Sequence, residues 1–372
     1  PIYSLTTAER AQYKAEAKIF RAMVMFDMVR LWGDFPVITT VADDITSENI
    51  DEVYPQYFPK QNTELEAYQQ IEKDLLDAVL YAPDNTPGNK TLFSKSVART
   101  LLAKIYAEKP LRDYTKVIQY CDEVKEDGFD LVDDFSDLFG MNAAGTDAKM
   151  RNTKESILEA QFTSGAGNWC TWMFGRDLVN WNNNFTWAKW VTPSRDLISA
   201  FKQEGDEVRF KESIVYYDCN WSNYYPSDNY PFMYKCRSAN SSIIKYRYAD
   251  VLLLKAEALI MQDTPDLEGA ADIIDEVRDR AKLGALPTSV RSNKNVLLNA
   301  LLKERRLELA FEGQRWFDLV RLDKVEEVMN AVYAKDSGRK AQIYTFDKNS
   351  YRLPIPQSVI DANDKIHQNP GY

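Results

Sequence analysis

The apolar residues of the first 32 positions recur at steps of three and four. This spacing is the period of one face of an α-helix, and it predicts a helix over residues 8–32. Gly33 and Pro36 end it, because glycine admits a left-handed turn and proline lacks the amide hydrogen that a helix needs to continue. The apolar positions are Ala11, Ala15, Ile19, Ala22, Phe26 and Val29.

Seven further segments combine an apolar face with a charged face and are predicted to be helices. A stretch rich in Asp, Tyr and Pro, residues 41–61, indicates a long exposed loop. Because helices dominate both ends of the chain, the predicted fold class is mostly α. The further helices are expected at about 62–81, 94–109, 113–126, 246–263, 266–282, 293–312 and 316–334.

Two of the predicted helical hairpins share one residue pattern. Sliding the chain by 153 residues lays residues 98–124 over 251–277 without a gap, so that alanines and apolar positions coincide. Helix pairs of about 34 residues with alanines at the contacts are the unit of tetratricopeptide-like repeats. We therefore expect tetratricopeptide-like hairpins that form a scaffold. The full Trp-Leu-Gly signature is absent, so two unrelated amphipathic hairpins remain the alternative.

The middle of the chain has a different composition. Residues 165–235 contain six of the eight tryptophans and many Asn, Ser, Gly and Pro residues, with no helical or strand period. Such segments lie at the surface and carry binding sites on a rigid scaffold. We expect a loop-rich, aromatic-rich insertion that carries the ligand site. The expected single domain, residues 1–372, comprises a helical scaffold (8–164 and 246–334), a loop-rich ligand-binding part (165–245) and a C-terminal tail (335–372).

Composition and motifs exclude several functional classes. The 46 basic and 56 acidic residues give a net charge of −10 without a basic run, which argues against nucleic acid as a partner. A single histidine, His367, argues against histidine-based catalysis and histidine-rich metal centres. Glycine-rich phosphate loops and nucleophile elbows are absent. We predict no catalytic residue, no metal site and no cofactor, and no apolar stretch is long enough to cross a bilayer.

Two features are assigned structural roles. Cys219 and Cys236 flank an aromatic segment and form a candidate disulfide in an oxidising compartment, although four cysteines allow three pairings. Glu304, Glu308 and Glu312 follow one helix stripe, where like charges repel unless cations intervene. The obvious cations are nearby, and we expect them to bridge to neighbouring helices or loops. They are Arg305, Arg306 and Arg315.

The middle segment interleaves aromatic residues with asparagines. Sugar rings present an apolar C–H face and a rim of hydroxyls, which suits flat aromatic surfaces beside amide groups. The alternative is that the aromatics fill a subsidiary core, but residues 181–187 read Trp-Asn-Asn-Asn-Phe-Thr-Trp, which is too polar for a core strand. The predicted ligand-binding residues are Trp181, Asn183, Trp187, Trp190, Trp221, Tyr224 and Tyr225, with Tyr54 in the opposite wall.

Three separated stretches resemble the SusD/RagB family. The first runs from Ala-Glu-Ala-Lys-Ile-Phe-Arg-Ala at 15–22 to Leu-Trp-Gly-Asp-Phe-Pro at 31–36. The second combines Tyr-Arg-Tyr-Ala-Asp-Val-Leu-Leu-Leu-Lys-Ala-Glu-Ala at 246–258 with Glu-Arg-Arg-Leu-Glu-Leu-Ala-Phe-Glu-Gly-Gln-Arg-Trp-Phe-Asp-Leu at 304–319. The third combines Leu-Pro-Ile-Pro at 353–356 with the final Gln-Asn-Pro-Gly-Tyr. Their order and spacing cover almost the whole chain.

The resemblance implies a helical scaffold of tetratricopeptide-like hairpins and a loop-rich part with the ligand site. It implies a non-catalytic surface lipoprotein that binds oligosaccharide and delivers it to a SusC-like, TonB-dependent transporter in the outer membrane. Lipid anchoring would come from an N-terminal segment that this sequence lacks. Two alternatives stay open, a peptide-binding member of the same system and an intracellular helical-repeat scaffold. The ligand residues lie outside the shared motifs, so none is transferred from the family.

Overall fold

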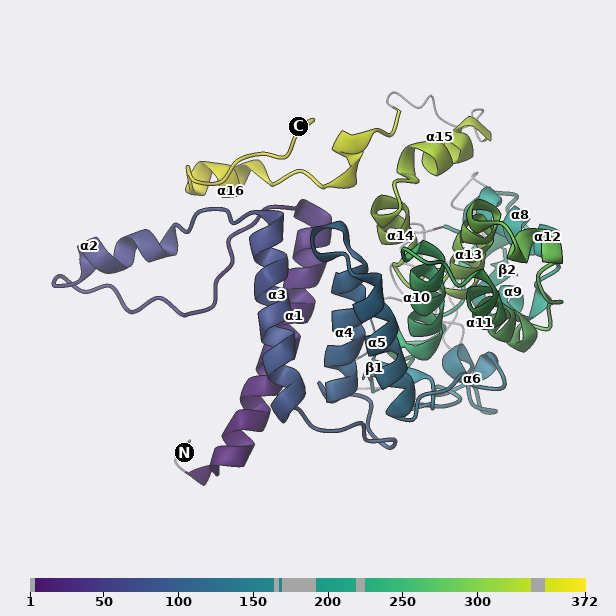
Figure 1. Cartoon of the computed structure of the whole chain (residues 1–372), viewed down its shortest axis with the longest axis horizontal. Helices are drawn as coiled ribbons and strands as arrows, with labels where there is room; N and C mark the ends of the chain where they lie inside the picture. The colour runs from purple at the N-terminus through teal and green to yellow at the C-terminus, as the bar shows by residue number, and fades with distance from the viewer. Residues whose placement is uncertain (1–3, 164–166, 169–191, 219–224, 336–344) are drawn as a thin grey trace. The chain divides into compact units, whose positions relative to one another are not determined.

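The computed structural model describes residues 4–163, 167–168, 192–218, 225–335 and 345–372 (Figure 1). Helices account for most of the described elements, as the sequence predicted. Backbone contacts divide the chain into two compact units. The first comprises residues 1–82, 104–113 and 316–372, and the second comprises residues 83–103 and 114–315. The expectation of a single domain stays a prediction.

The first unit is built on a long helix pair. Its elements are α1 (Thr7–Trp32), α2 (Ile50–Val53), the 3-10 helix η2 (Tyr54–Tyr57), α3 (Glu64–Tyr81), η3 (Lys109–Leu111), α15 (Val325–Lys335), η5 (Lys348–Tyr351) and α16 (Gln357–Ala362). Helix α4 (Lys95–Ala107) begins in the second unit and ends in the first, and α14 (Arg315–Arg321) also crosses this boundary.

Helices α1 and α3 pack through the apolar face that the periodicity predicted. Ile19, Ala22 and Phe26 are fully buried, and the ring of Phe26 meets Tyr68 of α3 edge-on at 6.2 Å between centroids. Both helices begin with a threonine capping box, in which side chains satisfy amide groups that the first turn leaves without helical partners. The predicted helix over residues 8–32 is confirmed as α1.

The end of α1 is closed by the C-terminal tail of the chain. Gly33 has φ 72°, a left-handed conformation that glycine adopts without steric cost. The carbonyls of the last turn, which have no helical partner, are satisfied by the tail: Leu353 N donates to Leu31 O (2.7 Å) and Asn369 Nδ2 to Trp32 O (2.9 Å). The Gly-Asp-Phe-Pro turn and the final Asn-Pro-Gly-Tyr stretch are thus parts of one structural unit.

The second unit combines helical hairpins with two small sheets. Its helices are α5 (Tyr114–Glu126), α6 (Ser136–Phe139), α8 (Arg195–Glu204), α9 (Glu207–Ser213), α10 (Tyr248–Met261), α11 (Leu267–Arg280), α12 (Thr288–Arg291) and α13 (Lys294–Glu308). Strand β1 (Ser156–Ala160) pairs antiparallel with β4 (Ile243–Arg247). Strand β2 (Ile214–Tyr217) pairs antiparallel with β3 (Tyr230–Met233).

The repeated hairpins are confirmed as structural equivalents. Helices α10 and α11 begin 153 residues after α4 and α5, which is the offset of the sequence comparison. Arg99 of α4 bridges to Glu123 (2.9 Å) and Asp127 (2.6 Å) at the end of α5, while α5 and α11 both pack against α10. The tetratricopeptide-like scaffold therefore places α5, α10 and α11 in one packed layer.

Two predicted helices have different limits from those expected. The segment 316–334 forms two helices, because Asp323 adopts φ 54° between α14 and α15, a left-handed conformation that interrupts a right-handed helix. Helix α13 ends at Glu308, four residues early, and Phe311 (φ 67°) lies in the turn that follows. Glu312 is therefore outside the helix stripe on which the sequence placed it.

The middle segment is more regular than its composition predicted. Residues 195–213 form α8 and α9, and β2 and β3 pair nearby. Helix α8 inserts Leu197, Ile198 and Phe201 into a core cluster with Leu307 and Ala310. The expectation that no helical period organises residues 165–235 was wrong for this part, because α8 places Leu197, Ile198 and Phe201 on one buried face between an N-cap at Ser194 and a C-cap at Gly205. The loop expected at 41–61 also contains the short helices α2 and η2.

Candidate ligand-binding site

Six of the eight predicted ligand-binding residues lie outside the described residues, and their roles stay predictions. They are Trp181, Asn183, Trp187, Trp190, Trp221 and Tyr224. Cys219 also lies outside, so the predicted disulfide is untested. Its proposed partner, Cys236, is buried, and its sulfur accepts a hydrogen bond from Asn168 Nδ2 (3.1 Å). The two predicted residues that the structure describes are Tyr225 and Tyr54.

Tyr225 is a half-buried anchor in the second unit. Its hydroxyl donates to Pro193 O (2.8 Å), and the guanidinium of Arg195 lies 4.7 Å from its ring centroid. Tyr230 meets the same ring edge-on at 5.6 Å. Cation–π and edge-on contacts of this kind hold an aromatic ring in one orientation. Tyr225 therefore fixes the backbone that leads out of residues 219–224.

A single stretch, residues 230–241, holds the chain ends that flank the aromatic-rich segments. Thr192, which follows residues 169–191, hydrogen-bonds through Oγ1 to the hydroxyl of Tyr230 (2.9 Å). Tyr217 pairs with the same Tyr230 across β2 and β3. On the other side, Asn168 N donates to Ala239 O (2.6 Å). We call residues 230–241 the anchoring strand and turn.

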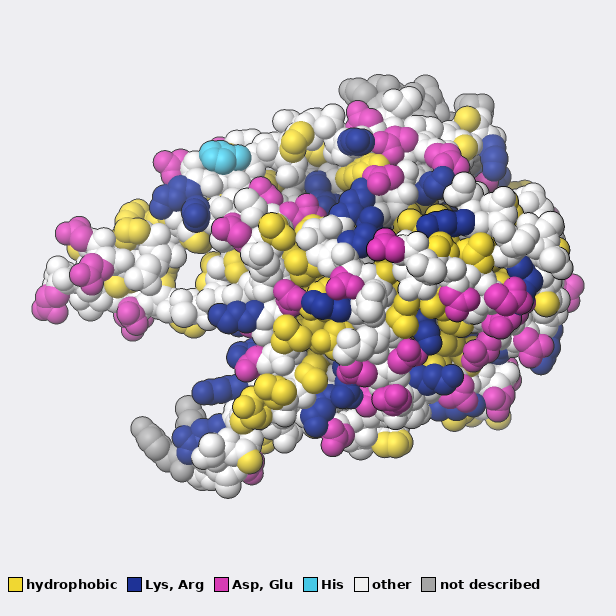
Figure 2. All heavy atoms as spheres, viewed as in Figure 1, with side chains coloured by type: hydrophobic (Ala, Val, Ile, Leu, Met, Phe, Trp, Pro, Cys, Tyr) yellow, Lys and Arg dark blue, Asp and Glu magenta, His cyan; other side chains and the backbone are white. Residues whose placement is uncertain are grey.

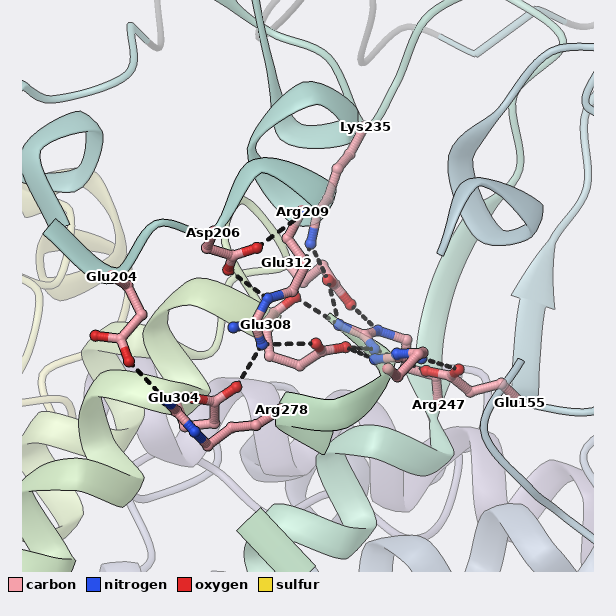
Figure 3. Close-up of polar contacts among 11 residues, drawn as sticks. Glu155, Glu204, Asp206, Arg209, Lys235, Arg247, Arg278, Glu304, Glu308 and Glu312 are labelled. Carbon is pink, nitrogen blue, oxygen red and sulfur yellow. Dashed lines mark hydrogen bonds and ion pairs between the residues drawn. The ribbon is translucent and has the colours of Figure 1, made fainter. Parts of the chain in front are cut away.

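The anchoring strand and turn is tied to a buried network of charges (Figure 3). Lys235 Nζ donates to Glu312 Oε1 (2.6 Å) and to the backbone oxygen of Glu308 (2.9 Å). Arg237 bonds the carboxylate of Glu212 and its backbone oxygen (3.2 Å). Charged hydrogen bonds in a buried setting are among the stronger polar contacts in proteins. This stretch is therefore held by buried charged contacts of Lys235 and Arg237 as well as by the pairing of β3 with β2.

Glu308 is the centre of that network. It is fully buried, and its carboxylate accepts from Arg247 and Arg280 through Oε1 and from Arg209 through Oε2 (3.0 Å). Figure 3 shows arginines from separate elements converging on the glutamates of α13 and the turn after it. Arg247 also bonds Glu312 (2.7 Å) and Glu155 (2.7 Å). One glutamate thus joins β4, α9 and α11 to the end of α13.

Burial and pairing set the ionisation of the network. Burial raises the pKa of Glu308, but the guanidiniums of Arg280, Arg247 and Arg209 together lower it further, so the pKa lies well below its ordinary value. Burial also raises the pKa of Glu312, but Arg247 and Lys235 lower it further, so this pKa is below its ordinary value as well. Burial lowers the pKa of Lys235 to about 8 although Glu312 raises it. At neutral pH both glutamates are therefore ionised and paired.

The arginines nearest in sequence have other partners. Arg305 bonds Asp250 of α10 (2.7 Å) and Arg306 bonds Asp196 of α8 (2.7 Å), so the expected bridges to neighbouring helices are confirmed. Arg315 donates to the backbone oxygen of Leu302 (2.9 Å). As cations for the glutamate stripe, however, they were the wrong choice. Glu308 pairs instead with Arg209, Arg247 and Arg280, which are 28 to 99 residues away.

Beside the anchoring strand and turn lies one small cavity of about 10 Å³, room for roughly one water molecule. Lys235, Ser241 and Phe139 are among its lining residues. No group of three or more His, Cys, Asp or Glu side chains within the described part of the chain is arranged to hold a metal ion. Nor is any described helix long and apolar enough to span a bilayer.

Tyr54 lies in the first unit, at the start of η2, in the segment of sequence that connects α1 to α3. Its ring is half exposed and packs on Phe58 at 4.9 Å between centroids, with the planes tilted by 51°. Tyr225 belongs to the second unit. The expectation that Tyr54 forms an opposite wall of the ligand site therefore stays a prediction.

Comparison with known proteins decides the family. Residues 228–372 match the model of the SusD family, and residues 3–107 match a SusD-like model described as starch-binding and associating with the outer membrane. The chain belongs to the SusD/RagB family. The two matched regions contain the three stretches that carried the resemblance in the sequence.

Curated and solved members of the SusD/RagB family resemble most of the chain. SusD-like protein P2 of Formosa agariphila is 29% identical over 96% of this chain and 74% of its own length. Starch-binding protein SusD of Bacteroides thetaiotaomicron is 24% identical over 99% of this chain and 74% of its own. A laminarin-binding SusD-like protein of known structure has a TM-score of 0.73 at 24% identity and covers 99% of this chain and 80% of its own.

Proposed function

We propose that this protein is a non-catalytic, surface-exposed and lipid-anchored binding protein for oligosaccharide, which it delivers to a TonB-dependent transporter in the outer membrane. The observation that carries the proposal is the anchoring strand and turn. It holds the described flanks of both aromatic-rich segments, through Tyr230 and Ala239, and is itself fixed to the buried network through Lys235. A site held by packed, hydrogen-bonded supports loses less entropy when ligand binds.

The composition of the supported segments suits a saccharide. Residues 169–191 and 219–224 contain six tryptophans together with several asparagines. Indole faces stack on the C–H face of a pyranose, and amide groups match its hydroxyls. Relatives named for binding starch and laminarin support this ligand class. The family model described as associating with the outer membrane supports the location.

The ionisation of one pair of carboxylates that follow each other in sequence supports binding without catalysis. Asp133 and Asp134 are neighbours in sequence, whereas a glycosidase needs two carboxyl groups held a set distance apart across the sugar bond, one of them as proton donor. The pKa of Asp134 is lowered to about 2, first by the hydrogen bond from the Ser136 amide and then by its hydroxyl and Lys149. Asp133 accepts from Lys154 (3.1 Å). An aspartate that stays ionised at neutral pH does not donate a proton to a leaving group.

The test is calorimetry with maltooligosaccharides and laminarin oligosaccharides. Replacing Trp181→Ala together with Trp187→Ala is expected to weaken binding at least about tenfold, the equivalent of about 1.4 kcal/mol, without changing the melting temperature. Tyr13→Ala, which removes an exposed aromatic side chain from α1, is the control. Unchanged affinity in the double variant would reject these two residues as the platform.

The purified wild-type protein also distinguishes saccharide from peptide as the ligand. Wild-type protein that binds no saccharide on a glycan array, but that carries peptide identified by mass spectrometry, would replace the saccharide proposal with peptide binding.

A further inference from the structure

A projecting segment, residues 37–59, connects α1 and α3 in the first unit (Figure 1). We call it the arm. Its base is closed by an isolated β-bridge between Phe35 and Asn62, with Asn62 N donating to Phe35 O (3.0 Å) and Val37 N donating to Asn62 Oδ1 (3.0 Å). The arm therefore leaves the helix pair from a fixed point.

Further hydrogen bonds tie the arm to the rest of the first unit. In the C-terminal tail, Asn363 Nδ2 donates to Pro59 O (2.8 Å) and Lys365 Nζ donates to Phe58 O (2.9 Å). Arg21 of α1 donates to Thr39 O (3.2 Å). Contacts to both ends of the arm restrict its orientation before any partner is present, and this reduces the entropy lost on binding.

The arm also has an internal structure of its own. The hydroxyl of Tyr57 donates to Asp43 O (3.1 Å), and Asn49 Nδ2 donates to Asp44 O (3.0 Å). Asn49 Oδ1 accepts from Thr46 N (2.7 Å). These bonds draw the two sides of the arm together across α2 and η2.

The arm exposes an unusual amount of apolar surface. Val41 is 95% exposed, which leaves nearly all of its side chain in water. Single exposed apolar residues are normal, but several on one short projection mark an interaction site. Figure 2 shows apolar side chains along the arm with acidic groups at its outer end. The exposed apolar side chains are Ile38, Val41, Ile45, Ile50, Tyr54 and Tyr57.

The charge on the arm has one sign. Its 23 residues include five carboxylates and no lysine or arginine, and each carboxylate is exposed. No lysine or arginine among the described residues forms an ion pair with any of them. Like charges on a short segment repel one another, and a cationic partner would relieve that repulsion. The five are Asp43, Asp44, Glu48, Asp51 and Glu52.

These properties favour a protein as the occupant. A neutral sugar has no cationic group to pair with five carboxylates. An anionic membrane surface would repel the arm. Protein interfaces, by contrast, combine an apolar, aromatic centre with a charged rim, and complementary charge steers the encounter.

We propose that the arm docks onto a protein surface that is apolar at its centre and edged with lysine and arginine side chains. In naming that partner as the outer-membrane transporter, the proposal rests on the proposed function. The apolar side chains around Val41 fill the centre of the contact, and Asp43 and Asp44 meet the basic edge.

The first test measures binding of the transporter from the same gene neighbourhood, purified in detergent, to immobilised protein. Asp43→Lys with Asp44→Lys is expected to weaken binding at least about tenfold, mainly by slowing association. Raising the salt from about 50 to 500 mM should slow association of the wild type and have little effect on the variant. The matched control reverses two exposed carboxylates outside the arm, Glu126→Lys with Asp263→Lys, and should bind as the wild type does.

A second pair of variants tests the apolar centre. Val41→Ser with Ile45→Ser is expected to speed dissociation, with a loss of about tenfold or more in affinity. Leu80→Ser with Val296→Ser, which changes two exposed apolar residues of α3 and α13, is the control. Arm variants that bind the transporter as the wild type does, or a wild type that does not bind it, would overturn the proposal.

Two further measurements separate the possible failures. All arm variants should keep the oligosaccharide affinity of the wild type. A wild type that docks on the transporter but binds no oligosaccharide would refute the proposed function and leave the arm as a docking surface. Light scattering of the wild type and the arm variants tests self-association. A dimer that the arm variants convert to monomer would make a second copy the occupant and would overturn the assignment to the transporter.

Discussion

The glutamates around α13 and the carboxylates of the arm show how differently acidic residues behave in two regions of one chain. Glu304 and Glu308 are buried and meet arginines from distant elements. Asp43 and Asp44 are exposed, and no described cation pairs with either of them. Buried charges that are paired hold a fold in one arrangement, and their removal is costly. Exposed charges of one sign contribute little to stability and instead influence what approaches the surface.

The largest expected effect comes from the centre of the network. Glu308→Gln leaves the guanidiniums of Arg209, Arg247 and Arg280 without their shared carboxylate in a buried setting. Removing one partner of a buried ion pair costs about 3–5 kcal/mol. We expect a loss of that size in the free energy of unfolding, measured by urea denaturation.

The control for this variant is a glutamate in a surface pair. Glu327 of α15 bonds Lys324 (2.6 Å), the residue before that helix, and is largely exposed, so Glu327→Gln should cost less than about 0.5 kcal/mol. A Glu308→Gln variant as stable as this control would show that the network is not what holds the anchoring strand and turn.

A smaller effect is expected from acid. The folded pKa values of Glu308 and Glu312 are lowered, so the unfolded chain binds more protons than the folded chain as pH falls below about 4.5. Their contribution to stability is present above that pH and is lost below it, at up to about 1.4 kcal/mol per pH unit for each group. Glu304, whose pKa burial raises, contributes the opposite slope.

The variant Glu312→Gln isolates the contribution of Glu312 to the pH dependence of stability. The variant should be less stable than the wild type at pH 7, and the difference should narrow below about pH 4.5, as the wild-type carboxylate takes up its proton. Thermal unfolding followed by circular dichroism between pH 3 and pH 7 measures it. A constant difference across this range would mean that Glu312 does not titrate with folding.

Local pattern predicted the helices well, because each long helix records its buried face in its own residues. The periodicity of Ile19, Ala22 and Phe26 predicted α1, and the offset of 153 residues predicted equivalent hairpins. Helix ends were less predictable, since the conformations of Asp323 and Phe311 depend on packing beyond the segment. Helix α8 was missed although its own residues carry the signal, with Leu197, Ile198 and Phe201 on one face and Ser194 as its N-cap; the loop-rich composition of the surrounding stretch concealed it.

The supports of the candidate site could not be predicted from spacing. Glu308 and its partner Arg209 are 99 residues apart, and no pattern in either segment predicts that the two side chains pair. The arm was recognised as a loop, but its contacts with the C-terminal tail join residues about 300 positions apart, and no local pattern predicts them. The tryptophans that the sequence favoured as the saccharide platform lie outside the described residues, so calorimetry on their variants provides the test.

The smallest expected effect is on the stability of the arm, and it completes the contrast with the network. Asp43→Lys with Asp44→Lys keeps the two backbone carbonyls that accept from Tyr57 and Asn49, and it removes two of five repelling charges. Melting temperature should therefore match the wild type, within the roughly 0.5 kcal/mol that is usual for surface substitutions. Hydrogen exchange of the arm amides should be unchanged as well. Faster exchange would mean that the carboxylates themselves hold the arm in shape, and the loss of docking in this variant would then reflect disorder rather than charge.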